Sequence, residues 1–266
     1  MDCSVIQADA VGLAGDWHGS ARHAVAAIGR FARLGAEGGP EVRWIFHLGD
    51  FGLWPNAMGV RYLNRVAEAL ARADLFMAVT PGNHEDWNEL EKAFAQGGYR
   101  EPVEGRPRLV FLPPGYRFDL VTSSGVTRRV LSVGGAPSVD SGQRVEGKTW
   151  WRGEAVTDAD VDRAVNGGRA DVLLAHDAPD DSTSAVRQIV EGPSPWPAEA
   201  LERARRGREQ LNRVCAAVRP SVYAHGHYHV HDVEQRGETL FASLDCQGRP
   251  GNLMLLDVEE LSVASL

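Results

Sequence analysis

Three apolar segments each end in a glycine followed by a polar side chain, and they recur at a nearly constant interval. Asp16 and Asp50 are 34 residues apart, and Asp50 and Asn83 are 33 apart. Amphipathic segments at 20–35 and 61–74 fill the intervals, so each step has the length of one βαβ unit, about 30 residues. This repetition predicts a parallel sheet with all three polar residues at the carboxyl ends of its strands. The three segments are AVGLAGD (10–16), VRWIFHLGD (42–50) and LFMAVTPGN (75–83).

The second half of the chain changes character. Residues 108–135 predict short strands joined by turns, with a hairpin tip at 123–125, as in the more antiparallel half of a sandwich. The glycine-rich stretch 136–156 predicts a functional loop. The remaining segments predict a strand at 170–179, a helix at 199–218, a strand at 221–231 and further strands in the tail, with turns at 248–251 and 259–260.

Composition narrows the class of protein. The formal charge of −8 at pH 7 disfavours a nucleic-acid-binding surface. Cys3, Cys215 and Cys246 form no CxxC pair, which favours a reducing cytosol. No signal peptide and no membrane-spanning run are recognisable, so we expect a cytoplasmic protein without a membrane partner. The sequence indicates no oligomeric state.

Five predicted strand ends carry side chains that bind metals. Carboxylate, imidazole and amide oxygen together suit a divalent transition metal such as Mn, Fe or Zn. Seven ligands are too many for one such ion and suit two, which is a known arrangement for attacking phosphate esters. The residues at these ends are Asp16 with His18, Asp50, Asn83 with His84, His176, and His227 with His229.

The same residues carry a family resemblance. The ordered series GDWHG (15–19), GD (49–50), GNHE (82–85), His176 and GHYH (226–229) resembles the calcineurin-like metallophosphoesterase superfamily. The resemblance implies an α/β fold: a four-layer αββα sandwich of two mixed β-sheets flanked by helices, as a single domain over 1–266. It also implies two divalent ions. Asp16, His18 and His229 would hold the first, Asp50 would bridge, and Asn83, His176 and His227 would hold the second.

The chemistry of the residues agrees with that assignment. A carboxylate has two oxygens, so Asp50 can bridge two cations, and a water between them would give a hydroxide at neutral pH. That hydroxide would attack phosphorus, while His84 protonates the leaving oxygen. Asp16 and His18 are expected to point the same way because residues i and i+2 of an extended strand do so, and Trp17 between them is expected to pack.

Each residue also has a simpler interpretation. Asp16, Asp50 and Asn83 could each cap a helix, and His176 could satisfy a backbone group. Strand alternation places four histidines of 221–231 on one face, of which His225 and His231 are interpreted as supporting or surface groups. His47 is interpreted as a hydrogen-bonded structural histidine and His23 as solvent-facing. Glu85 and Asp86 are expected to favour the start of the next helix. Trp150 and Trp151 either pack or form a platform for the substrate, with packing the commoner role. Arg144 is a candidate phosphate clamp or a surface arginine.

Three functions remain open. The first is a phosphatase or phosphodiesterase whose partner is a phosphate-ester substrate, a soluble small molecule or a phosphoprotein. The second is a nuclease on the same fold, which the net charge disfavours. The third is a non-catalytic scaffold, which has no need of His84. The protein-phosphatase branch carries GDxVDRG and RGNHE where this chain has GDFGLW and PGNHE, which disfavours a protein Ser/Thr phosphatase.

Overall fold

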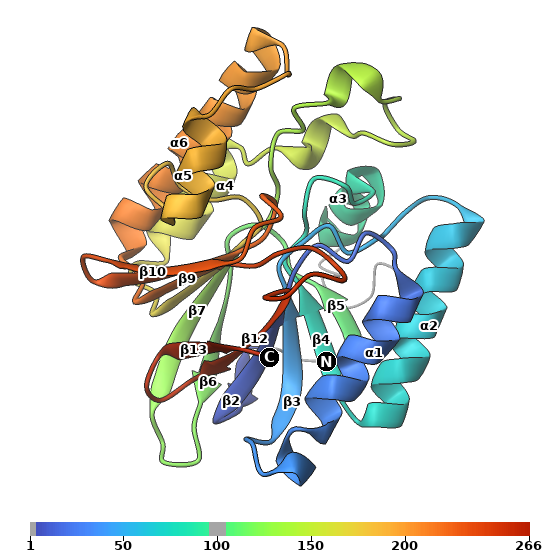
Figure 1. Cartoon of the computed structure of the whole chain (residues 1–266), viewed down its shortest axis with the longest axis vertical. Coiled ribbons are helices and arrows are strands. Elements are labelled where there is room, and N and C mark those ends of the chain that lie inside the picture. Colours follow the sequence, from blue (N-terminus) through green and yellow to red (C-terminus); the bar gives the residue numbers. More distant parts are fainter. Residues whose placement is uncertain (1–3, 96–104) are drawn as a thin grey trace.

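Two mixed β-sheets pack face to face in the computed structural model, and helices cover their outer faces (Figure 1). The structure describes residues 4–95 and 105–266, so Cys3 lies outside the described residues. Within these ranges, no helix is long and apolar enough to cross a membrane.

The six-stranded sheet contains the predicted βαβ units. Its strands run in the order β13-β12-β2-β3-β4-β5, and β2 to β5 are parallel. Helices α1 (Ala21–Arg33), α2 (Ala57–Ala73) and α3 (Trp87–Ala95) connect these strands. Helix α2 begins earlier than the apolar pattern indicates, because Asn56 caps it by accepting the Met58 and Gly59 N–H groups. The strands are β2 (Ala10–Ala14), β3 (Val42–His47), β4 (Phe76–Val79), β5 (Leu109–Phe111), β12 (Leu253–Asp257) and β13 (Ser262–Ser265).

The seven-stranded sheet has the order β1-β6-β7-β8-β9-β11-β10. The turn at 123–125 joins β6 to β7 as predicted, and β7, β8 and β9 are parallel. Stretch 136–156 is a loop with short 3₁₀ turns at Ser141–Gln143 and Arg152–Glu154. The elements are β1 (Val5–Gln7), β6 (Tyr116–Val121), β7 (Thr127–Val133), α4 (Asp158–Asn166), β8 (Val172–Ala175), α5 (Ser184–Glu191), α6 (Ala198–Val218), β9 (Val222–His225), β10 (Asp232–Arg236) and β11 (Thr239–Ser243).

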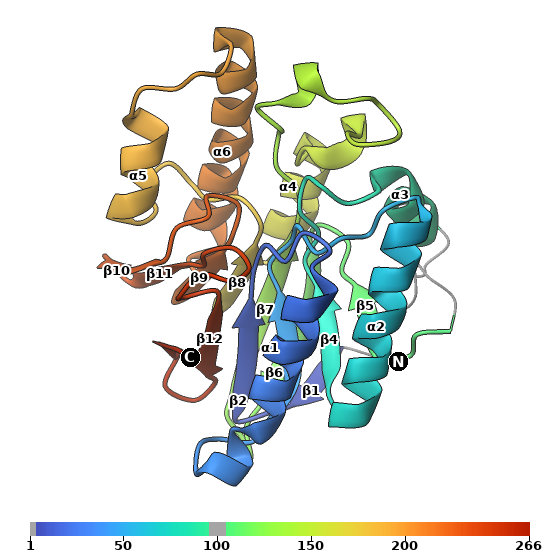
Figure 2. The same cartoon turned by 45° about the vertical axis from the view of Figure 1, so that its right-hand side comes forward.

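Three apolar cores separate four layers. The central core joins the two sheets, with Leu13 and Phe46 from one and Val130 and Leu174 from the other. A second core lies between the six-stranded sheet and α1 to α3, and a third between the seven-stranded sheet and α4 and α6. Figure 2 shows these helices on opposite sides of the paired sheets. The predicted αββα sandwich is therefore confirmed.

The loops that follow β2, β3 and β4 lie side by side because these strands are adjacent and parallel. The loops that follow β8 and β9 come from the facing sheet and reach the same region. Residues from both sheets can therefore meet above the central core, which is the place where sheets of this kind bind ligands.

Candidate metal centre

Asp50 lies at the centre of the converging loops. It follows β3, and its side chain is only 2% exposed. Its Oδ2 is 3.4 Å from His18 Nε2, and its Oδ1 is 3.4 Å from His176 Nε2. The two oxygens of one carboxylate thus face imidazoles from different sheets.

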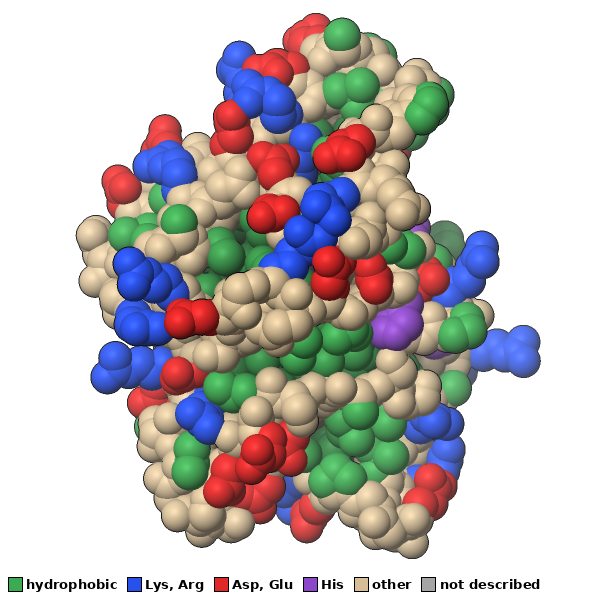
Figure 3. Space-filling model, turned by 60° about the vertical axis from the view of Figure 1, so that its left-hand side comes forward, with side chains coloured by type: hydrophobic (Ala, Val, Ile, Leu, Met, Phe, Trp, Pro, Cys, Tyr) green, Lys and Arg blue, Asp and Glu red, His purple; other side chains and the backbone are tan. Residues whose placement is uncertain are grey.

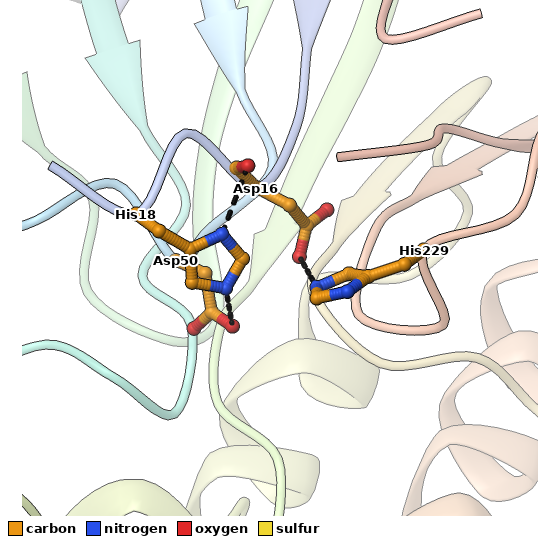
Figure 4. Close-up of side chains that lie close together, drawn as sticks. All are labelled: Asp16, His18, Asp50 and His229. Atoms are coloured by element: carbon orange, nitrogen blue, oxygen red, sulfur yellow. Dashed lines mark hydrogen bonds and ion pairs between the residues drawn. The ribbon is translucent and has the colours of Figure 1, made fainter. Parts of the chain in front are cut away.

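The first group of potential ligands comes from the loops after β2, β3 and β9. The ligand atoms of its four members all lie within 4.8 Å of one another. Asp16 Oδ1 is 3.5 Å from His229 Nε2, and His18 turns its Nε2 towards Asp50 (Figure 4). The Nδ1 atom of His18 lies 3.0 Å from Gln247 Oε1, which orients the ring. The members are Asp16, His18, Asp50 and His229.

The second group shares Asp50 with the first. Its ligand atoms, from Asp50, His176 and His227, also lie within 4.8 Å of one another. Asn83 adds an amide oxygen, since its Oδ1 is 2.9 Å from His176 Nε2. The Asn83 Nδ2 donates to Ser138 Oγ at 2.9 Å, which fixes the amide so that its oxygen faces the group. All seven predicted ligand residues are therefore brought together, in two groups around one carboxylate.

The backbone aims these side chains through an uncommon conformation. Asp16, His18, Asp50, His227 and His229 have φ between 43° and 70°. Non-glycine residues rarely adopt this left-handed region, and each instance costs on the order of 1–2 kcal/mol. Such strain gathers at functional sites, where the surrounding structure enforces it. Asp16 and His18 do lie in one group, as predicted. The expected cause is wrong, because their backbone is left-handed and not an extended strand.

The buried carboxylates need positive charge beside them. Burial disfavours a charge on His18, but Asp50 and Asp16 outweigh it and raise the pKa of His18 to about 9. Burial would also raise the pKa of Asp50, but His176 and His84 hold it well below its usual range. Burial lowers the pKa of His227, which favours the neutral imidazole that binds metals. This donor set of ionised carboxylate, imidazole and amide oxygen fits two divalent cations.

The sequence comparison decides the family. Residues 10–231 match the family described as calcineurin-like phosphoesterase. This chain belongs to the calcineurin-like phosphoesterase family. It is therefore a metallophosphoesterase, and this family uses a dinuclear divalent metal site. Among curated proteins, none matches the sequence significantly.

Solved structures resemble this family member in fold. One aligns over 97% of this chain and 98% of its own, with a TM-score of 0.58 and 15% identity. A dimetal phosphatase from Danio rerio aligns over 92% of this chain and 91% of its own, with a TM-score of 0.54 and 13% identity. GAP50, an anchor in the inner membrane complex of Plasmodium, aligns over 93% and 81%, with a TM-score of 0.51 and 11% identity.

His84 of this phosphoesterase stands beside the two groups and belongs to neither. Its Nε2 is 3.7 Å from Asp50 Oδ2, and its ring is 25% exposed. Arg144 approaches both ring nitrogens, at 2.7 Å from Nδ1 and 3.0 Å from Nε2, but a neutral imidazole can accept only one hydrogen bond. Burial, and then the Arg144 charge, lower the pKa of His84 to about 4 against the opposing effect of Asp50. Arg144 also pairs with Asp140 at 2.6 Å.

Glu85 has a role that the sequence interpretation missed. Its carboxylate accepts backbone N–H groups from Asp50, Phe51, Gly52 and Gly82, and so joins the loops after β3 and β4. Burial and the nearby Asp50 raise its pKa to about 7, while the backbone donors oppose that rise. Glu85 is the fourth residue of the GNHE motif (82–85), and this position is the sequence feature that could have predicted its role.

Several supporting residues differ from their predicted roles. His47 is buried, yet neither ring nitrogen has a hydrogen-bond partner, so its interpretation as hydrogen-bonded is wrong. His23 is half-buried and bonds Asn252 at 2.6 Å, so it is not simply solvent-facing. Strand β9 ends at His225, so alternation does not place the four histidines on one face. His225 instead contacts Ser182 at 2.8 Å.

Other interpretations hold. Trp17 is fully buried, and Trp151 is 2% exposed within the core beneath α3. Asp86 accepts the Glu89 N–H at the start of α3, as expected for a residue before a helix. Trp150 is half-buried and donates to Glu154 at 2.7 Å.

Proposed function

We propose that this protein hydrolyses a phosphate ester with two divalent cations, of which manganese is the first candidate, as a single domain over residues 1–266 in the cytoplasm. The observation that carries the proposal is the position of Asp50. It is the one residue that the two groups of potential ligands have in common. A shared carboxylate sets the spacing of two ions, which a phosphate ester needs at its attacking and leaving oxygens.

The residues divide between the ions as follows. Asp16, His18 and His229 would hold one ion, Asn83, His176 and His227 would hold the other, and Asp50 would serve both. Bound there, the cations supply positive charge against the phosphate oxygens and a nucleophilic hydroxide at neutral pH. The two groups of ligand atoms support this division, because the atoms of each group lie within 4.8 Å of one another and Asn83 Oδ1 is 2.9 Å from His176 Nε2.

His84 serves as the general acid. Its backbone N–H donates to Asp50 Oδ1 at 3.0 Å, which fixes the residue beside the ions without using its ring. The exposed part of the ring can then meet the leaving oxygen of the substrate. Arg144 contacts the phosphate. The negative charge of the phosphate then offsets the positive charge of Arg144, which otherwise lowers the pKa of His84, and so helps His84 to keep its proton.

A nuclease and a scaffold are the competing functions. On the face drawn in Figure 3, basic and acidic side chains are interspersed and form no continuous basic stripe. Together with the net charge of −8, this disfavours nucleic acid as the substrate. A scaffold without catalysis has no use for His84 beside a complete set of ligand residues.

The test is a hydrolysis panel. The purified protein is assayed with Mn, Fe, Zn and Mg against aryl and alkyl phosphomonoesters, phosphodiesters, cyclic nucleotides and DNA, beside the Asp50→Asn variant. We expect metal-dependent hydrolysis of a small ester that Asp50→Asn loses. Hydrolysis of DNA alone would favour the nuclease. Metal binding without hydrolysis of any ester would favour the scaffold.

A further inference from the structure

A pocket of about 280 Å³ opens directly beside His84. Its walls come from the loop after β3, the start of α2 and the 136–156 loop. A larger pocket, of about 410 Å³, lies between α2 and residues 105–108 and contains none of the predicted site residues. Of these two, only the pocket beside His84 can therefore receive part of a substrate held at Asp50. Its lining residues include Trp54, Met58, His84, Arg144, Lys148 and Trp151.

Half of the eight lining residues are apolar or aromatic, and the other half are polar or charged. Trp54 is fixed in place, since its Nε1 donates to the His84 carbonyl at 3.2 Å. Met58 is 62% exposed and leaves apolar surface open to a ligand. Trp151 is 2% exposed and its indole N–H has no hydrogen-bond partner. Trp54 and Met58 therefore present apolar surface that suits a flat apolar group, whereas Trp151 is buried in the core.

The pocket also contains an unbalanced positive charge. Lys148 is exposed, and no ion pair or hydrogen bond of its side chain occurs in the described part of the chain. Arg144, in contrast, already has Asp140 as its partner. The chain has only two lysines, Lys92 and Lys148, and its net charge is −8. A cation without a partner at the mouth of this pocket suits an anionic group at the far end of the ligand.

We propose that this pocket binds the leaving group of the substrate, and that this leaving group is an aromatic ring system carrying a second anionic group. The inference rests on the proposed function, because His84 faces the leaving oxygen only if the phosphate lies at Asp50. The ring system contacts Trp54 and Met58, and the anion lies against Lys148. Small alkyl phosphates leave the pocket empty.

The test uses binding and hydrolysis together. Three aryl phosphates of similar leaving-group basicity are compared with manganese bound: phenyl, 2-naphthyl and a carboxylated 2-naphthyl phosphate. The matching arylmethylphosphonates, which cannot be hydrolysed, are titrated by calorimetry. The second ring buries roughly 50 Å² more apolar surface, so the naphthyl compounds should bind about tenfold tighter than phenyl. The carboxylate should add about a two- to fivefold gain.

Two variants assign the gains to residues. Met58→Ala should reduce the naphthyl preference, and Lys148→Ala should abolish the carboxylate preference. Lys92→Ala, which removes the other lysine on an exposed face of α3, is the matched control and should retain both preferences. Phenyl phosphate hydrolysis with equal affinity for all three phosphonates would overturn this inference while leaving the proposed function intact. Absence of hydrolysis with the predicted order of binding would instead overturn the proposed function. Weak, equal binding of every phosphonate without hydrolysis would overturn both.

Discussion

Replacing Glu85 with glutamine tests how the loops of the metal centre are held together. The carboxylate is fully buried, and each of its oxygens accepts two backbone N–H groups. Oε1 accepts Phe51 at 2.7 Å and Gly52 at 3.1 Å, while Oε2 accepts Asp50 at 3.1 Å and also Gly82. Glutamine has the same shape, so the substitution changes the hydrogen bonds and leaves the packing in place.

The expected loss follows from that symmetry. Whichever way the amide of the new glutamine lies, its NH₂ group faces two of the four N–H donors. Two buried donors then lose their acceptor, at about 1–3 kcal/mol each, which lowers the unfolding free energy by up to about 2–6 kcal/mol. The neutral glutamine also removes the cost of ionising a carboxylate whose pKa burial has raised, and this offsets part of the loss at pH 8. For a chain of this size the melting temperature should fall by up to roughly 20 °C. Bound metal should also decrease, because Asp50 is held by the same contacts.

The assay is urea and thermal unfolding at pH 8 in the presence of a chelator, so that metal loss does not add to the effect. This pH lies above the pKa of about 7 that burial and Asp50 give to Glu85, which keeps the wild-type carboxylate ionised. Glu89→Gln is the matched control, since Glu89 is half-exposed and pairs with Lys92 at 3.8 Å. Glu89→Gln should lower the unfolding free energy by less than about 1 kcal/mol. Equal unfolding free energies for the two variants would refute the reasoning.

Three further predictions concern the site and its supporting core. His84→Asn should retain both metals and much of its nitrophenyl-ester activity, but lose about 10²–10⁴-fold in kcat/KM on alkyl esters, whose basic leaving groups need a proton; equal losses on both esters would contradict an acid role. Asp50→Ala should lose more activity and more bound metal than His229→Ala, because both ions lose a ligand; similar values in the two variants would exclude a bridge. His47→Leu should be more stable than wild type in urea. Burial lowers the pKa of His47 well below 6.5, so the unfolded chain takes up a proton below that pH and the folded chain does not. The stability gained by the leucine should therefore widen by about 1.4 kcal/mol per pH unit below pH 6.5, and a constant difference would show that His47 titrates normally.

The sequence predicted the strand ends well because they depend on local signals. An apolar run followed by Gly-Asp or Gly-Asn marks both the strand and its end, and helix-length intervals imply parallel neighbours. The pairing of β2 with β3 and of β3 with β4 follows from that pattern. Asp16, Asp50 and Asn83 accordingly lie at one edge of one sheet.

The geometry of the loops could not be predicted, because contacts between distant residues determine it. The left-handed conformation of Asp16 is accompanied by a hydrogen bond from the backbone of His227, 211 residues away. Glu85 joins two loops across 35 residues. Strand β9 ends before the GHYH motif, so a two-residue period cannot place His227 and His229. A two-residue period predicts side-chain directions within one strand only. The positions of these loop residues depend on contacts with several other segments of the chain.

A crystal structure of the manganese-loaded protein with anomalous scattering shows whether two cations share Asp50. We expect two anomalous peaks about 3.5–4 Å apart, with one Asp50 oxygen on each ion. Asn83, His176 and His227 should surround one peak, and Asp16, His18 and His229 the other. A single peak at full manganese occupancy, or two ions without Asp50 between them, would show that the cations do not share Asp50.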